Sequence, residues 1–100
     1  MIKNIKIGYA EYAVCLVPAK RMGDDYGEFR NHEREILLNQ SLSGPELVAT
    51  LLHEIFHGIY HQYDVKDDDN EERTVAALSN GLMAVFKDNP ALLAFIKKNI

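Results

Sequence analysis

An apolar stripe from residue 47 to residue 59 constrains the fold of this chain most. Apolar residues recur there at spacings of three and four, as on a helix that buries one face against a core. They are Leu47, Val48, Leu51, Leu52, Ile55, Phe56 and Ile59. Ser43 and Glu46 match a capping box, and Pro45 suits the first turn. The sequence therefore predicts a long helix that begins at Ser43 and packs on another layer.

Two histidines lie four residues apart on the flank of this helix, in the HExxH segment His53-Glu54-Ile55-Phe56-His57. Positions i and i+4 are about 40° apart around a helix and about 6 Å apart along it, so both imidazoles can reach one Zn²⁺ ion. Glu54 follows at about 100° and can hold a metal-bound water without binding the metal itself. We expect His53 and His57 as zinc ligands and Glu54 as a general base. The alternative is a helix with two structural histidines at its edge.

His61 continues the same spacing but is not expected to bind the metal. Eight residues of helix span about 12 Å, which is too far for one ion to bind both His53 and His61. A third histidine six residues after His57 is also missing, because Gln62 and Tyr63 occupy that region. His61 is therefore interpreted as a surface residue or a support for the site.

A third ligand is expected from a second helix, predicted from about residue 70 to residue 87. Positions 75, 78, 82, 85 and 86 are apolar there at helical spacing. A carboxylate in its first turn would complete a site of two histidines and one glutamate, with an open fourth position. Glu71 and Glu72 each share a helix face with Val75, so spacing alone allows either. The alternative for both is that they only complement the helix dipole.

The remaining segments predict strands before these helices and a short helix after them. Residues 2–17 are typical of one or two strands broken near Gly8, and residues 20–27 are rich in turn residues. Phe29 begins a short strand that forms a hairpin with Glu35–Asn39. Pro90 ends the second helix and starts a third. The fold class is thus α+β, with a mixed or antiparallel sheet packed on the HExxH helix and two C-terminal helices, in one domain of residues 1–100.

Composition excludes several classes of protein. The net charge is −4 and the cations are dispersed, which argues against a nucleic-acid partner. No apolar run approaches 18 residues, so no membrane segment is expected. The single cysteine, Cys15, permits no intrachain disulfide and argues against a structural zinc site rich in cysteine. A reducing, cytoplasmic location fits best. Asp67, Asp68 and Asp69 are interpreted as a solvated loop rather than a cation site.

The chain resembles the gluzincin branch of the HExxH metallopeptidases, especially short phage or prophage-type proteins of the ImmA/IrrE-like and SprT-like groups. Beyond HExxH, the similarity includes Tyr26-Gly27-Glu28, Glu35-Ile36-Leu37-Leu38, Leu78-Ser79-Asn80-Gly81-Leu82 and Asp88-Asn89-Pro90. The resemblance implies a small zincin-like domain whose edge strand lines the substrate cleft. It also implies that the glutamate three residues before Val75, Glu72, is the third ligand rather than Glu71.

The function expected from these residues is zinc-dependent hydrolysis of a peptide bond by a metal-bound water, with Glu54 as general base. His32, Tyr60, His61 and Tyr63 are candidates to stabilise the oxyanion, and the sequence does not choose among them. The backbone of Glu35–Asn39 is a candidate edge to which a peptide or protein substrate adds as a strand. The alternative function is a regulatory module that binds zinc and acts through contacts with other proteins.

Overall fold

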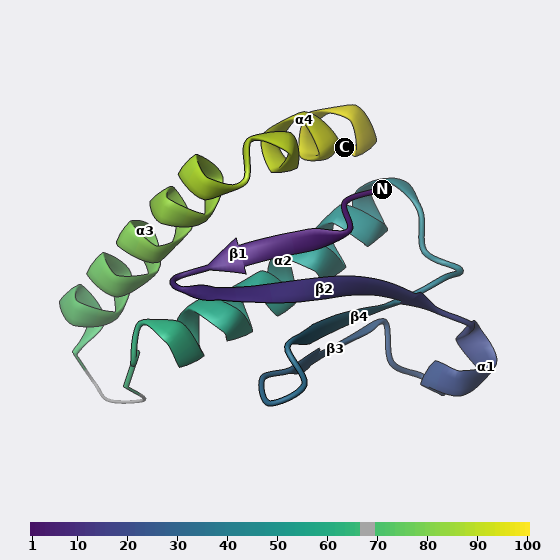
Figure 1. Cartoon of the computed structure of the whole chain (residues 1–100), viewed down its shortest axis with the longest axis horizontal. Coiled ribbons are helices and arrows are strands. Elements are labelled where there is room, and N and C mark those ends of the chain that lie inside the picture. Colours follow the sequence, from purple (N-terminus) through teal and green to yellow (C-terminus); the bar gives the residue numbers. More distant parts are fainter. Residues whose placement is uncertain (67–69) are drawn as a thin grey trace.

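In the part of the chain that the structure describes, the fold consists of a four-stranded sheet, one short helix and three long helices, with the strands preceding the long helices along the chain (Figure 1). The computed structural model describes residues 1–66 and 70–100, so the interpretation of Asp67, Asp68 and Asp69 lies outside the described residues. The strands are β1 (Asn4–Ile7), β2 (Ala10–Val17), β3 (Gly27–Arg30) and β4 (Glu35–Asn39). The helices are α1 (Ala19–Met22), α2 (Gly44–Gln62), α3 (Glu71–Asp88) and α4 (Pro90–Asn99). The predicted α+β class is confirmed.

The sheet is mixed and has the order β1-β2-β4-β3. β1 and β2 are antiparallel and are joined through Gly8, whose φ of +62° suits glycine, so the break predicted near Gly8 separates two strands. β3 and β4 form the predicted hairpin, whereas β2 and β4 run parallel. The expectation that Glu35–Asn39 is a sheet edge was therefore wrong. The apolar segment of β4 is buried on both faces and lies between two neighbours, and β3 forms the open edge.

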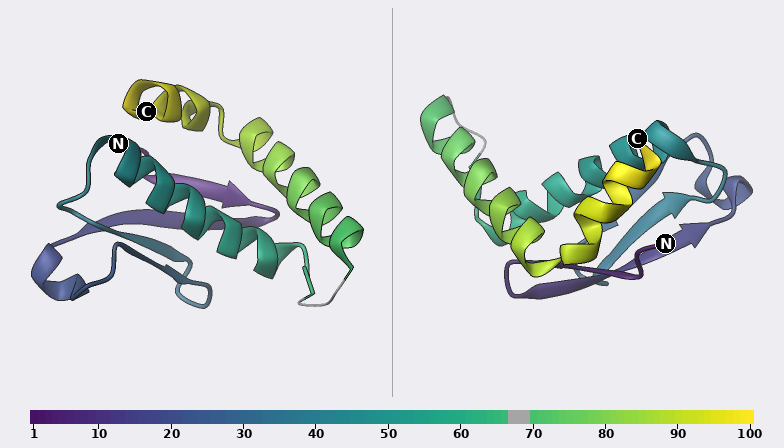
Figure 2. Two further views of the ribbon diagram at one scale, coloured as in Figure 1. Left: turned by 180° about the vertical axis from the view of Figure 1, so that it is seen from behind. Right: turned by 90° about the horizontal axis from the view of Figure 1, so that it is seen from above.

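Helix α2 lies along one face of the sheet and buries the predicted stripe there (Figure 2). Ile55 and Ile59 of α2 are fully buried against the sheet. Gly58 allows this close approach, because a Cβ atom there would overlap the side chain of Ile7 and lie 3.2 Å from the ring of Phe29. The fully buried side chains of the core are Ile5, Ile7, Tyr12, Ile36, Leu38, Leu51, Ile55, Ile59, Val85 and Leu92.

The start of α2 differs from the prediction. Ser43 is the N-cap residue, but its side chain makes no capping hydrogen bond, so the capping box is absent. Gly44 has a φ of +59°, and this left-handed turn directs the chain away from the geometry that the box requires. The turn-rich region before β3 differs as well, since Ala19–Met22 forms one helical turn. Cys15 is half-buried in β2.

The turn between β3 and β4 is tied to α2 through the hydroxyl of Tyr12. This hydroxyl donates to Asn31 Oδ1 at 2.7 Å and accepts from the guanidinium of Arg34 at 3.1 Å and from Gln62 Nε2 at 2.8 Å. Arg34 has a φ of +57°, a conformation that this turn requires. Because Tyr12 is fully buried, the network joins β2, the turn and the last turn of α2 around one fixed point.

The corner between α3 and α4 is attached to β1 by Asn89. Its side chain accepts from the Lys6 amide at 2.9 Å, donates to the Lys6 carbonyl at 2.8 Å and donates to the Val85 carbonyl at 2.7 Å. Proline at residue 90 then starts α4, as predicted. Within residues 1–66 and 70–100, no helix is both long enough and apolar enough to cross a membrane.

Replacing Asn89 by alanine tests the importance of this corner. Asn89→Ala removes three hydrogen bonds and should lower the free energy of unfolding by about 2 kcal/mol, measured by urea denaturation. The matched control is Asn80→Ala on the exposed surface of α3, where the change should stay within about 0.5 kcal/mol. Equal effects of the two substitutions would contradict the assignment.

Candidate active site

Helix α2 presents His53 and His57 one turn apart, with their side chains converging. The two Nε2 atoms lie 3.3 Å apart, and the ring planes are inclined at 73°. Two ligand atoms at 2.0–2.1 Å from a tetrahedral zinc ion lie about 3.3–3.4 Å apart. The pair therefore fits two positions of a tetrahedral metal site without rearrangement.

Glu54 lies beside this pair but belongs to the buried side of the helix. Its residue is only 5% exposed, and its carboxylate and the two imidazoles offer ligand-type atoms that all lie within 4.8 Å of one another. Burial raises the pKa of Glu54 above its ordinary value; the charge of His53 opposes this shift, and the charges of Glu28 and Asp25 add to it. A carboxylate with a raised pKa accepts a proton more readily than one at the surface.

Phe29 of β3 supports the histidines from the side of the sheet. Its ring stacks on His57 with centroids 6.5 Å apart and on His61 with centroids 5.4 Å apart. Burial lowers the pKa of His57, and the charges of His53 and His61 lower it further. His57 thus favours the neutral imidazole, which is the form that binds metals. His61 lies against Phe29 and outside the group formed by His53, Glu54 and His57.

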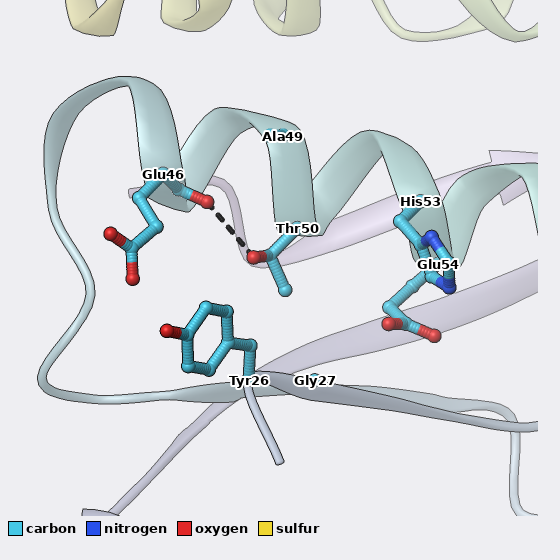
Figure 3. Close-up of a pocket in the computed structure, with 7 residues that line it drawn as sticks. All are labelled: Tyr26, Gly27, Glu46, Ala49, Thr50, His53 and Glu54. Carbon is cyan, nitrogen blue, oxygen red and sulfur yellow. Dashed lines mark hydrogen bonds between the residues drawn. The ribbon is translucent and has the colours of Figure 1, made fainter. Parts of the chain in front are cut away.

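A cavity of about 420 Å³ adjoins His53 and Glu54 between α2 and the start of β3 (Figure 3). The residues that line it are Tyr26, Gly27, Glu46, Ala49, Thr50, His53 and Glu54. The Thr50 hydroxyl donates to the Glu46 carbonyl at 2.9 Å, so the methyl group of Thr50 points toward Gly27 across the cavity. The cavity gives a bound molecule direct access to the carboxylate of Glu54.

Gly27 is a residue of this site that sequence reasoning missed. A Cβ atom at this position would lie 2.8 Å from Thr50 Cγ2, 2.9 Å from Glu54 Oε2 and 3.1 Å from the Leu37 carbonyl oxygen. The backbone of β3 therefore passes directly beside the carboxylate, and only glycine fits there. The sequence did contain a signal, because a glycine inside a strand often marks a close approach of the backbone to another group.

β3, which lines the cavity through Gly27, is also an open edge of the sheet. Tyr26 accepts a hydrogen bond from the Asn39 amide at 2.8 Å, and Gly27 pairs with Leu38 in the antiparallel register. In such a ladder, alternate residues direct their amide and carbonyl groups away from the neighbouring strand. Gly27 and Phe29 are the residues of β3 that do so.

The other sequence candidates lie apart from the cavity. Glu71 and Glu72 are exposed in the first turn of α3, and neither joins the group formed by His53, Glu54 and His57. Asn70 caps that turn by accepting from the Arg73 amide at 3.0 Å. The choice between Glu71 and Glu72 as a ligand stays a prediction. The four oxyanion candidates, His32, Tyr60, His61 and Tyr63, do not line the cavity.

Comparison with known proteins identifies one family. The family model described as the IrrE N-terminal-like domain, a family of peptidases, matches residues 9–87. The match runs from the turn before β2 to the last turn of α3, so it contains His53, Glu54 and His57. No curated protein and no solved structure gives a significant match.

Replacing His57 tests whether the paired histidines bind metal. His57→Ala removes one of two converging nitrogen donors and should weaken zinc binding on the order of 100-fold or more, measured by competition with a chromophoric chelator. His32→Ala, in the exposed turn after β3, is the matched control and should bind zinc as the parent protein does. Unchanged zinc affinity in His57→Ala would exclude this metal site.

Proposed function

The chain belongs to the peptidase family of IrrE N-terminal-like domains, and we propose that it hydrolyses peptide bonds with a zinc ion held by His53 and His57. The observation that carries this proposal is the 3.3 Å separation of the two Nε2 atoms beside the carboxylate of Glu54. Imidazole nitrogens are common ligands of zinc, and a tetrahedral arrangement suits it. When bound, the ion would act as a Lewis acid toward water and toward the carbonyl of the substrate.

Glu54 is proposed to move the proton in this reaction. Its carboxylate borders the cavity, where it can accept a proton from the attacking water and deliver it to the leaving amine. Burial favours this role, because the raised pKa of Glu54 makes its carboxylate a stronger proton acceptor. Gly27 supports the same role by leaving the space that the carboxylate occupies.

The third ligand is proposed to be Glu72 of α3, with Glu71 as the alternative. The proposal rests on the family resemblance and on the position of both residues in the first turn after α2. α3 packs against α2 where Gly81 meets Ile59, so the two helices are already neighbours. An exposed glutamate in a first turn can adopt the rotamer that a metal requires at little cost in packing.

The peptide substrate is proposed to bind along β3. The outward amide and carbonyl groups of Gly27 and Phe29 offer a strand edge to which an extended peptide adds. Phe29 and Gly27 are also the residues that contact His57 and Glu54, so a peptide on this edge lies alongside the proposed catalytic groups. β3, and not Glu35–Asn39, is the open edge on this side of the sheet, so strand addition is proposed at β3.

Substitution of Glu54 separates catalysis from metal binding. Glu54→Gln should keep zinc and lower the rate of peptide hydrolysis by about 10²–10⁴-fold, measured with a fluorogenic peptide library and a chelator control. Glu33→Gln, in the exposed turn after β3, should retain the parent rate. Full activity in Glu54→Gln would refute its role as the general base. Zinc binding without any hydrolysis by the parent protein would instead favour the regulatory module.

Paired substitutions in α3 identify the third ligand. Glu72→Gln should weaken zinc binding by about 10–100-fold, whereas Glu71→Gln should change it by less than about 3-fold. Isothermal titration with zinc measures both variants under one set of conditions. The reverse order of effects would assign the ligand role to Glu71, and equal affinities would assign it to neither residue.

A further inference from the structure

The cavity beside Glu54 ends in a second carboxylate. Figure 3 shows His53 and Glu54 at one end of the cavity and the carboxylate of Glu46 with the hydroxyl of Tyr26 at the other. Glu46 and Glu54 are separated by eight residues of α2, which corresponds to about 12 Å along the helix. The cavity therefore extends from the proposed catalytic carboxylate to a second acidic group about two helical turns away along α2.

The walls between the two ends are mainly apolar. The ring of Tyr26, the methyl groups of Ala49 and Thr50 and the bare backbone of Gly27 line this part of the cavity. Such a lining suits the methylene stem of a lysine or arginine side chain, which packs on apolar surface while its charged head reaches a polar end. A purely aliphatic side chain would fill the walls but leave the carboxylate of Glu46 without a partner.

The carboxylate of Glu46 is free to bind such a head. Among residues 1–66 and 70–100, no hydrogen bond or ion pair engages its side chain; only its backbone carbonyl is used, by Thr50. Tyr26 is 56% exposed, and its ring is available for a cation–π contact. The alternative is that Glu46 only complements the positive end of the α2 dipole. That role would not depend on which peptide is bound.

The acidic groups around the cavity also favour a cationic substrate. Glu46 and Glu54 both line the cavity, and Asp25 directly precedes Tyr26 of its wall. The chain as a whole carries a net charge of −4. A negative field attracts cationic groups and repels anionic ones, so it favours a basic substrate segment before any contact is made.

We propose that this cavity is the specificity subsite of the peptidase and that it binds a lysine or arginine side chain adjacent to the bond that is cleaved. Glu46 pairs with the cationic head, and the ring of Tyr26 packs against it. This inference rests on the proposed function, because it assigns the substrate class of the same site. It names Glu46 and Tyr26 as specificity-determining residues, separate from the groups that hold metal or move protons.

Peptide binding to a hydrolysis-deficient protein tests the subsite directly. The probes are short fluorescein-labelled alanine-rich peptides that differ only in one central residue, which is lysine, arginine, norleucine or glutamate. Their affinities for zinc-loaded Glu54→Gln are measured by fluorescence anisotropy. The lysine and arginine peptides should bind about 10–100-fold more tightly than the norleucine peptide, as for a hydrogen bond to a charged group, and the glutamate peptide most weakly.

Variants in the same Glu54→Gln background assign the preference to named side chains. Glu46→Gln should abolish the advantage of lysine and arginine, and Glu46→Lys should transfer the advantage to the glutamate peptide. Tyr26→Leu should reduce the advantage several-fold, as expected for the loss of a cation–π contact. Glu11→Gln, an exposed glutamate on β2, is the matched control and should leave all four affinities unchanged.

A second variant keeps the test decisive if Glu46 matters for folding. Thermal unfolding is measured for every variant. If Glu46→Gln does not fold, Ala49→Leu is used instead, because it fills the cavity without changing a charge. Ala49→Leu should weaken the lysine, arginine and norleucine peptides more than the glutamate peptide, since their long unbranched side chains enter the cavity furthest. Equal weakening of all four peptides would contradict the subsite.

Digestion of a peptide library by the parent protein distinguishes this inference from the proposed function. Cleavage sites enriched in lysine or arginine at one flanking position support both the subsite and the proposed peptidase function. Cleavage without that enrichment, together with equal affinities for the four peptides, overturns the subsite and leaves the peptidase standing. A preference for basic peptides without cleavage supports the cationic subsite and overturns the proposed hydrolysis. Neither cleavage nor preference overturns both.

Discussion

The close packing of α2 on the sheet is the constraint on which the rest of the structure depends. Ile55 and Ile59 turn toward the sheet, and Gly58 brings the helix axis close to Ile7 and Phe29. This orientation leaves His53 and His57 on the exposed flank of the helix while Glu54 is drawn into the interface with β3. The orientation of α2 about its axis thus provides two accessible nitrogen donors and one partly desolvated carboxylate.

Much of the fold follows from periodicities that are local in the sequence. The helical stripe that includes Leu51 and Ile55, the hairpin before it and Pro90 after it each depend on neighbours only a few residues apart, and the structure contains each of them. The convergence of His53 and His57 follows in the same way, since helix geometry alone places positions i and i+4 together. The identity of the third ligand does not follow from local geometry, because it depends on how α3 crosses α2.

Other features depend on contacts between distant segments, and these were missed. The parallel pairing of β4 with β2 moves β4 inside the sheet, which no alternation within residues 35–39 reveals. The positive φ of Gly44 removes the capping geometry that Ser43 and Glu46 suggested. That difference has a physical meaning, because Glu46 is then free to face the cavity rather than the start of the helix.

The hydrogen bonds between Tyr12 and the turn after β3 protect the site against a shift in the register of β3. A slip of β3 by one residue relative to β4 would put Tyr26 or Glu28 in place of Gly27 against the carboxylate of Glu54, since strand side chains alternate between faces. Asn31 and Arg34, held by the Tyr12 hydroxyl, oppose such a slip. Tyr12, Asn31 and Arg34 therefore fix the register of β3 beside the cavity.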